Sequence, residues 1–277
     1  MNMYNPRKGG YVLGEIITVT ISKGGVLKTS IVSNLGSAIA KTYPDKRVLL
    51  IESDPQGNLS DSFGIDSEAL PYSLFDVYTG EKSFHEVKQP ILHNMDIVPA
   101  KNELNDLDYR IWTSYEREGI KPFELLKDAI RDVRDDYDYI LIDTPPAYSL
   151  NVGNILSITD KVIIPIQLEP YALKGLRKAV DMVGYYNERR KNPIVIAGVL
   201  ATLVRNTFLH KELLKQTKQY CESKGIPMLN TVIKQSIKYA ESVAIEGKPA
   251  VLSDKGSARD KELLNAYYEI MEEIIHE

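Results

Sequence analysis

The chain has 277 residues, 43% of them hydrophobic, which is enough for one large α/β domain or two smaller ones. Its net charge of −4 at pH 7 gives no general affinity for nucleic acid, and its single cysteine, Cys221, excludes a disulfide framework, a four-cysteine zinc site and an iron–sulfur site held by one chain. The sequence shows neither a secretion signal nor an apolar run of membrane-spanning length, so we expect a cytoplasmic protein.

Strand and helix patterns alternate along most of the chain. Residues 1–14 contain a proline and three glycines and are expected to form a flexible tail. Residues 15–21 (EIITVTI) are rich in β-branched side chains and predict a buried strand, while residues 29–42 show apolar side chains at helical spacing. Further strands are expected at residues 47–52, 97–98, 137–143, 161–166, 194–202 and 228–233, and further helices at residues 122–133, 172–190, 210–223 and 260–275.

Most of these predicted strands are continuously apolar rather than alternating. Strands that are buried on both faces have this composition, as in a parallel sheet covered by helices. The pattern therefore predicts one doubly wound α/β domain over residues 15–277, with a mostly parallel sheet and helices on both faces. Residues 66–121 show the least regular pattern and are the expected place for insertions or mobile elements.

A candidate phosphate loop joins the first predicted strand to the first predicted helix. Backbone N–H groups of a glycine-rich turn and of the following helix N-terminus point toward an anion at such a junction. Lys28 is expected to reach the β- and γ-phosphates of a nucleotide, and the Thr29 hydroxyl is expected to ligate Mg²⁺. The predicted nucleotide-binding residues of this loop are Lys23, Gly24, Gly25, Val26, Leu27, Lys28, Thr29 and Ser30.

Two acidic segments follow other predicted strands. Residues 47–59 (RVLLIESDPQGNL) place Asp54 just beyond one strand, and residues 137–147 (YDYILIDTPPA) place Asp143 at the end of another. Because ligand sites of open α/β sheets lie beyond the carboxyl ends of the strands, we expect Lys28, Asp54 and Asp143 to meet at one edge. Asp143 is expected to hold Mg²⁺ through water. An ordinary turn or cap is the alternative for each segment.

The phosphate loop departs from the general pattern in two ways. Lys23 stands directly before Gly24-Gly25, and Leu27 occupies a place where the general pattern has glycine. Together with Asp-Pro-Gln-Gly-Asn at residues 54–58 and Asp-Thr-Pro-Pro at residues 143–146, this loop resembles that of the ParA/MinD family of P-loop ATPases, and within it the ParA-type partition ATPases. The likeness extends from about residue 15 to about residue 249.

The resemblance implies an ATP- and Mg²⁺-dependent ATPase that forms a homodimer around two nucleotides. Lys23 would reach across the interface to the partner's nucleotide. Asp54 would position or activate the attacking water and, with Thr29 and Asp143, contribute to the Mg²⁺ site. Hydrolysis would be slow without stimulation, because a dimer that acts as a timer needs a long-lived ATP state.

Three positions depart from the family pattern. Glu52 replaces the usual aspartate, and its longer reach predicts a slightly shifted Mg²⁺ shell. Leu27 fits the loop only if its φ is negative or if its side chain points away from the phosphate. Contacts to the nucleotide base are expected around Lys234 and Gln235, where this chain has Ile-Lys-Gln instead of Pro-Arg-Asn.

The basic residues are concentrated late in the sequence. Residues 172–260 hold 16 lysines and arginines against 8 acidic residues, a local balance of +8 in an acidic protein. Lys and Arg contacts to phosphate give binding that is independent of sequence and sensitive to salt. A solvated charged face explains any single basic residue equally well. The candidate DNA contacts are Lys211, Lys215, Lys218, Lys234, Lys238, Lys255 and Arg259.

ParA-type resemblance further implies non-specific DNA binding by the ATP-bound dimer, location on the nucleoid, and release by a centromere-binding, ParB-like adaptor that stimulates hydrolysis. The sequence leaves open whether the cargo is a plasmid or a chromosome, and which partner is involved.

The main alternative is a MinD-like or other cargo-positioning ATPase that acts at a membrane or on a protein assembly. A membrane-targeting end would be a basic amphipathic helix, whereas residues 261–275 have an acidic polar face that anionic lipid would repel. We therefore expect this segment to dock on the core and expect no membrane partner. Iron–sulfur carriers of this fold need two cysteines, and tyrosine kinases of this fold need a terminal tyrosine cluster. This chain has neither.

Overall fold

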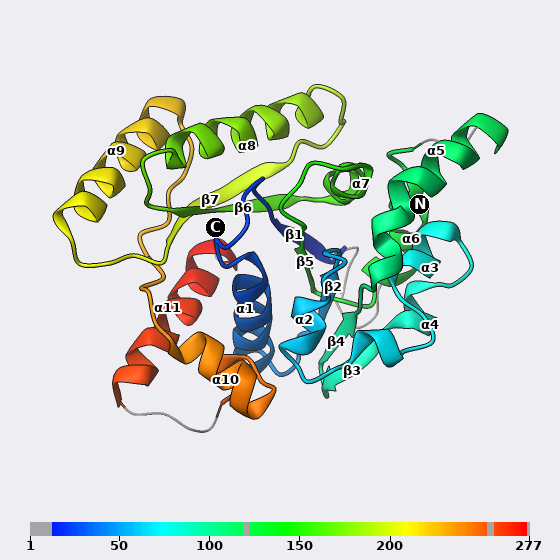
Figure 1. Ribbon diagram of the computed structural model, residues 1–277, viewed down its shortest axis with the longest axis horizontal. Coiled ribbons are helices and arrows are strands. Elements are labelled where there is room, and N and C mark those ends of the chain that lie inside the picture. The colour runs from blue at the N-terminus through cyan, green and yellow to red at the C-terminus, as the bar shows by residue number, and fades with distance from the viewer. Residues whose placement is uncertain (1–12, 119–121, 254–257, 276–277) are drawn as a thin grey trace.

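The computed structural model describes residues 13–118, 122–253 and 258–275 (Figure 1). Seven strands form one sheet in the order β3-β4-β2-β5-β1-β6-β7, and every neighbouring pair is parallel except β3 with β4. The strands are β1 Glu15–Val19, β2 Val48–Glu52, β3 Gln89–Leu92, β4 Met95–Val98, β5 Tyr139–Asp143, β6 Lys161–Gln167 and β7 Val195–Thr202. The predicted doubly wound, mostly parallel sheet is confirmed.

Helices cover both faces of this sheet (Figure 1). They are α1 Lys28–Thr42, α2 Asn58–Asp61, α3 Leu74–Thr79, α4 Phe84–Val87, α5 Leu107–Glu118, α6 Leu125–Arg134, α7 Leu150–Ile158, α8 Ala172–Asn187, α9 Phe208–Lys224, α10 Lys238–Glu246 and α11 Ala258–Ile275. Three short 3₁₀ turns, η1 Ser67–Ala69, η2 Asn102–Asp106 and η3 Ala250–Leu252, complete the described elements.

The alternation of side chains along β1 shows that the sheet is buried on both faces. Ile17 and Val19 belong to the cluster packed under α1 and α11, while Ile16 belongs to the cluster formed with α3 to α7 on the opposite face. A third cluster joins β6 and β7 to α8 and α9. Because successive side chains of a strand point to opposite faces, a continuously apolar strand requires helices on both sides.

The last helix docks on the core, as the acidic polar face predicted. Its apolar stripe is buried and packs in the same cluster as α1, through Tyr267, Ile270, Met271 and Ile274. In the described part of the chain, no helix is long and apolar enough to cross a membrane.

The strand predicted at residues 228–233 is wrong. This segment lies beside β7 and forms only isolated bridges, with Leu229 N–H donating to Val199 O (3.0 Å) and Ile233 N–H to Ala201 O (2.9 Å). The segment advances four residues, from Leu229 to Ile233, while β7 advances only two, from Val199 to Ala201. A regular ladder of hydrogen bonds therefore cannot form. The carboxylate of Glu273 on α11 accepts from the N–H groups of residues 230 and 231 in the intervening loop.

Within the irregular segment predicted at residues 66–121, the structure describes residues 66–118, and these form elements from η1 to α5 without a long structureless insertion. Of the predicted tail, residues 1–12 lie outside the described residues. Gly14 is hydrogen-bonded on both sides, because its N–H donates to Arg134 O (3.2 Å) and its carbonyl accepts from Arg134 Nε (2.8 Å).

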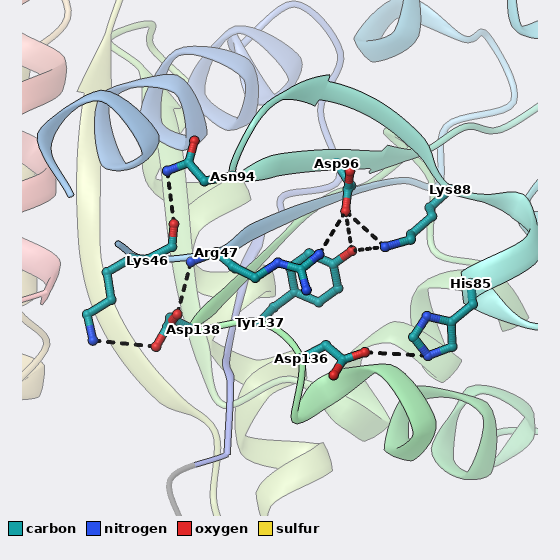
Figure 2. Close-up of polar contacts among 9 residues, drawn as sticks. All are labelled: Lys46, Arg47, His85, Lys88, Asn94, Asp96, Asp136, Tyr137 and Asp138. Carbon is teal, nitrogen blue, oxygen red and sulfur yellow. Dashed lines mark hydrogen bonds and ion pairs between the residues drawn. The ribbon is translucent and has the colours of Figure 1, made fainter. Parts of the chain in front are cut away.

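Charged side chains form a paired network at the amino-terminal edge of the sheet (Figure 2). Asp96 on β4 accepts hydrogen bonds from Lys88 Nζ (3.0 Å), from Arg47 (3.3 Å) and from the Tyr137 hydroxyl. Asp138 accepts from the N–H of Arg47 (2.9 Å). These contacts tie the starts of β2, β4 and β5 together and leave the carboxyl ends of the strands for the site described next.

Candidate nucleotide site

The phosphate loop connects the end of β1 to the first residue of α1. Gly25 has φ +72°, a conformation that favours glycine, and a Cβ built there would meet nothing within 4 Å. Gly24 and Gly25 are both exposed. The turn therefore presents backbone to an open space directly before a helix N-terminus, which is the arrangement that binds phosphate.

Leu27 is the N-cap of α1 and has φ +68° and ψ +26°. The negative φ considered from the sequence is therefore wrong, and Leu27 satisfies the other condition. Its half-buried side chain packs against the core cluster that contains Ile31 and Leu35. A left-handed conformation at a residue with a Cβ costs about 1–2 kcal/mol, and packing of the leucine side chain offsets part of that cost.

Lys28 places a buried cation beneath the loop. The residue is 7% exposed, and its Nζ donates a hydrogen bond to the carbonyl of Lys23 (2.9 Å). Burial lowers the pKa of Lys28, while the charges of Asp143 and Asp54 act in the opposite direction. The ammonium therefore lies close to both candidate carboxylates, as expected from the strand ends.

Asp143 and Thr29 form the candidate Mg²⁺ position. The Thr29 hydroxyl donates to Asp143 Oδ2 (2.7 Å), and Asp143 is 1% exposed. Its Oδ1 is buried and accepts no hydrogen bond from any described residue. Burial raises the pKa of Asp143 to about 7, opposed by the Thr29 hydrogen bond and by Lys28. A buried, unpaired carboxylate oxygen beside a hydroxyl fits the preference of Mg²⁺ for oxygen ligands.

Asp54 lies beside Asp143 because β2 and β5 are neighbours in register, with Glu52 opposite Asp143. Between them, the hydroxyl of Ser53 donates to the Asp143 carbonyl (2.6 Å). Asp54 is half-buried, and its Oδ1 accepts from the N–H of Gln56 (3.1 Å). The expectation that Lys28, Asp54 and Asp143 meet at one edge of the sheet is confirmed.

Glu52 lies opposite Asp143 in the register of β2 and β5, and its carboxylate is fully buried. The shift of the Mg²⁺ shell expected from its longer side chain stays a prediction. The Glu52 carboxylate accepts from Leu59 N–H, from the N–H and hydroxyl of Ser60, and from Ala100 N–H. Burial raises the pKa of Glu52 to about 7, and these hydrogen bonds oppose the shift. All of these donors come from the protein, so the carboxylate accepts hydrogen bonds from the first turn of α2 and from Ala100.

Lys23 lies at the rim of the loop rather than inside it. Its side chain is 37% exposed, and Nζ pairs with Glu169 Oε2 at 2.6 Å. Glu169 belongs to the turn that follows β6. The two lysines of the loop therefore occupy different environments, since Lys28 is buried and Lys23 is accessible.

The two candidate base contacts lie near the end of β7. Lys234 forms a bridge with Val204, and Gln235 donates its N–H to Val204 O (3.1 Å). The side chain of Gln235 accepts from Arg205 Nε, a contact that the sequence did not predict. Sequence reasoning missed Arg205 because residues 205 and 235 are 30 positions apart and meet only where the segment after α9 runs beside the end of β7.

The basic candidates fall into two groups. Exposed lysines 211, 215 and 218 share α9, which contacts α8 where Arg177 lies 5.4 Å from the ring centre of Tyr220 (Figure 1). Lys174 and Lys178 on α8 are also exposed, and sequence reasoning did not single them out. Lys238 is the first residue of α10, Arg259 lies in the first turn of α11, and Lys255 lies outside the described residues.

Comparison with known proteins agrees with this geometry. The profile of a family described as an AAA domain matches residues 14–196, which include the phosphate loop and both acidic segments. The chain is 34% identical over 247 residues to the sporulation initiation inhibitor protein Soj of Bacillus subtilis, covering 88% of this chain and 93% of that protein. It is 28% identical over 250 residues to the chromosome partitioning protein ParA of Myxococcus xanthus, covering 89% of this chain and 84% of that protein.

A solved structure extends the likeness to the bound state. Cobyrinic acid a,c-diamide synthase from Mycobacterium smegmatis, with bound ATP analog and magnesium, is similar with a TM-score of 0.77 and 26% identity. The match covers 94% of this chain and 93% of that chain.

Proposed function

The chain belongs to the ParA-type partition ATPases of the ParA/MinD family, which use ATP and Mg²⁺, and on this premise we propose that its ATP-bound form is a homodimer that carries DNA. In this proposal a ParB-like adaptor bound to a centromere-like site stimulates hydrolysis and releases the dimer. The single observation that carries the proposal is the separation of the two loop lysines, one buried at its own phosphate loop and one accessible at the rim.

Each loop residue has a separate task in binding. Lys28 and the backbone N–H groups at the start of α1 hold the β- and γ-phosphates, and Thr29 with Asp143 holds Mg²⁺. Mg²⁺, when bound, neutralises charge on the phosphate oxygens. Asp54 orients the attacking water, because it is the half-buried carboxylate of the edge and retains access to solvent. Gln235 and Lys234 contact the base.

The accessible lysine supports the dimer. The ammonium of Lys23 is paired with Glu169 on the outer rim of the loop. It would have to leave Glu169 to join Lys28 at the phosphates of its own nucleotide. A second copy that faces this edge would bring its γ-phosphate within reach of Lys23. Contacts to the γ-phosphate would then hold the dimer, and hydrolysis would remove them.

The basic residues of α8 and α9 support DNA as the cargo surface. Five exposed lysines lie on these two packed helices, namely Lys174, Lys178, Lys211, Lys215 and Lys218. Lys contacts to phosphate oxygens give binding that is independent of sequence and sensitive to salt, so these exposed cations favour DNA as the ligand. Lys234, Lys238, Lys255 and Arg259 remain candidates for the same role, and the nucleoid is the proposed location.

A DNA-binding titration tests this function. Purified protein is mixed with unrelated duplex DNA in the presence of ATP, ADP or no nucleotide, at two salt concentrations. We expect binding that requires ATP and weakens steeply with salt, with a Lys211→Ala/Lys215→Ala/Lys218→Ala variant that binds weakly yet hydrolyses ATP normally. The same samples are mixed with anionic vesicles. Vesicle binding without DNA binding would replace this function with the MinD-like alternative.

A further inference from the structure

Glu52 is a fully buried carboxylate with four donors and no solvent contact. Oε1 accepts from the N–H groups of Leu59 (2.5 Å) and Ser60 (3.2 Å). Oε2 accepts from the Ser60 hydroxyl (2.5 Å) and from Ala100 N–H (3.1 Å). Charge-assisted hydrogen bonds of this kind are among the strong ones in proteins, and a buried carboxylate is stable only when it is satisfied in this way.

These bonds close the loop that carries Asp54. Glu52 is the last residue of β2, while Leu59 and Ser60 lie in the first turn of α2, just after the loop formed by residues 53–57. The N-cap of α2 is Gly57, which has no side chain to bond the free N–H groups of that turn. The carboxylate from the entrance of the loop therefore supplies the cap at its exit.

The entrance of the loop is fixed on its other side as well. Ser53 N–H donates to the Asp143 carbonyl (3.1 Å), and Asn151 Nδ2 donates to the Ser53 carbonyl (2.7 Å). Tyr78 donates its hydroxyl to Asn151 Oδ1 (2.6 Å). Asp54 is thus the first residue of the segment that leaves this buried frame, and its position depends on the two anchored ends.

We propose that Glu52 is a positioning residue for hydrolysis, which holds the Asp54 loop and the backbone at Ala100 in the register that aims Asp54 at the nucleotide. This inference rests on the proposed role of Asp54. Glu52 is fully buried and its four donors come from the protein, so it acts through the loop that carries Asp54. Loss of an acceptor at position 52 therefore impairs the chemical step and spares nucleotide binding, which depends on the separate phosphate loop.

The test is Glu52→Gln, which keeps the shape and replaces one acceptor oxygen by a donor. In either orientation the amide leaves at least one backbone N–H without its acceptor, so the loop loses its register. We expect kcat for ATP hydrolysis to fall about tenfold while the Kd for ATP changes less than threefold. In an Asp54→Ala background the same substitution should cause no further loss.

The matched control is Glu86→Gln. Glu86 also accepts a backbone N–H at a helix start, that of Ser83 (2.9 Å), but it caps α4 and does not close the Asp54 loop. It should lower the unfolding midpoint and leave kcat of the folded protein unchanged. Equal losses of kcat in both variants would show a general stability effect and overturn the proposal.

Other outcomes separate the two ideas. An unchanged kcat for folded Glu52→Gln, or a loss that is equally large in the Asp54→Ala background, would overturn the positioning role alone. Normal hydrolysis by Asp54→Ala itself would instead refute the proposed role of Asp54. If Glu52→Gln fails to fold, Ser60→Ala removes one of the four donors, and it should lower kcat two- to threefold with ATP affinity kept. An unchanged kcat in Ser60→Ala would likewise overturn the inference.

Discussion

The two edges of the sheet differ in how their buried carboxylates are paired. At the amino-terminal edge, Asp96 is surrounded by Arg47, Lys88 and the Tyr137 hydroxyl, so its charge is paired within the protein (Figure 2). At the carboxyl edge, Asp143 is more deeply buried, yet one of its oxygens has no partner among the described residues. Paired charges hold a fold together, whereas an unpaired buried charge marks a place that a ligand completes.

The largest contrast concerns two lysines, one at each edge. Lys28→Ala removes the cation beneath the phosphate loop, and we expect ATP affinity to fall on the order of a hundredfold or more, because phosphate charge is then opposed only by backbone dipoles. Lys88→Ala, the matched variant at the amino edge, should leave ATP affinity unchanged. Calorimetric titration measures both. Retained ATP binding by Lys28→Ala would show that this loop is not the nucleotide site.

The second contrast concerns stability. Asp96→Asn leaves Arg47 and Lys88 next to each other without their counter-ion, so we expect the free energy of unfolding to fall by about 2–3 kcal/mol. Denaturant unfolding measures the loss, and ATP affinity serves as the control. A variant that is as stable as the parent but binds ATP tenfold more weakly would show that this network belongs to the functional site.

The pH dependence follows from the carboxyl edge. Burial raises the pKa of Asp143 from 3.8 to about 7 and that of Glu52 from 4.5 to about 7. The folded protein therefore keeps these protons to higher pH than the unfolded chain does, so their contribution to stability is present below about pH 4 and is lost as pH rises to about 7.

In the absence of nucleotide, this linkage should lower the free energy of unfolding on the order of 2 kcal/mol between about pH 6 and pH 7, with about half from each group. Denaturant titrations across that range measure it, and Asp143→Asn should remove about half of the pH dependence. A stability that rises over the same range would contradict the assignment of burial as the main cause.

The smallest expected effect lies at the strained end of the loop. Leu27→Gly relieves the left-handed conformation at φ +68° but removes a side chain that packs on the core, so we expect a net change within about 1 kcal/mol and a faster-exchanging loop. Thermal unfolding and amide exchange of residues 24–28 measure it. A loss above about 3 kcal/mol would show that packing of Leu27 outweighs the strain.

The sequence predicted the sheet and the phosphate loop because both signals are local. Glycines, Lys28 and Thr29 are adjacent in the chain, and each strand end delivers its own aspartate. The hydrogen bonds of Glu52 could not be predicted, since they depend on how the loop folds back to Ser60 and on Ala100, which is 48 residues away.

Errors in the predicted elements also have physical causes. The helix α7 escaped detection because it is buried on nearly every side and so shows no helical periodicity. The segment at residues 228–233 has the composition of a strand, but Glu273 from the distant α11 binds the N–H groups of residues 230 and 231 and breaks the ladder. Tertiary contacts override local propensity in both cases.

Thermal unfolding tests whether the unpaired carboxylate of Asp143 holds Mg²⁺. The parent, Asp143→Asn and Asp96→Asn are each unfolded at pH 8 without ligand, with ATP, and with ATP and Mg²⁺. We expect Asp143→Asn to raise the midpoint of the ligand-free protein and to lose the added stabilisation by Mg²⁺. Asp96→Asn should lower the midpoint and keep that stabilisation in full. If Asp143→Asn destabilises the ligand-free protein as Asp96→Asn does, or keeps the full Mg²⁺ effect, the unpaired carboxylate of Asp143 is not the metal site.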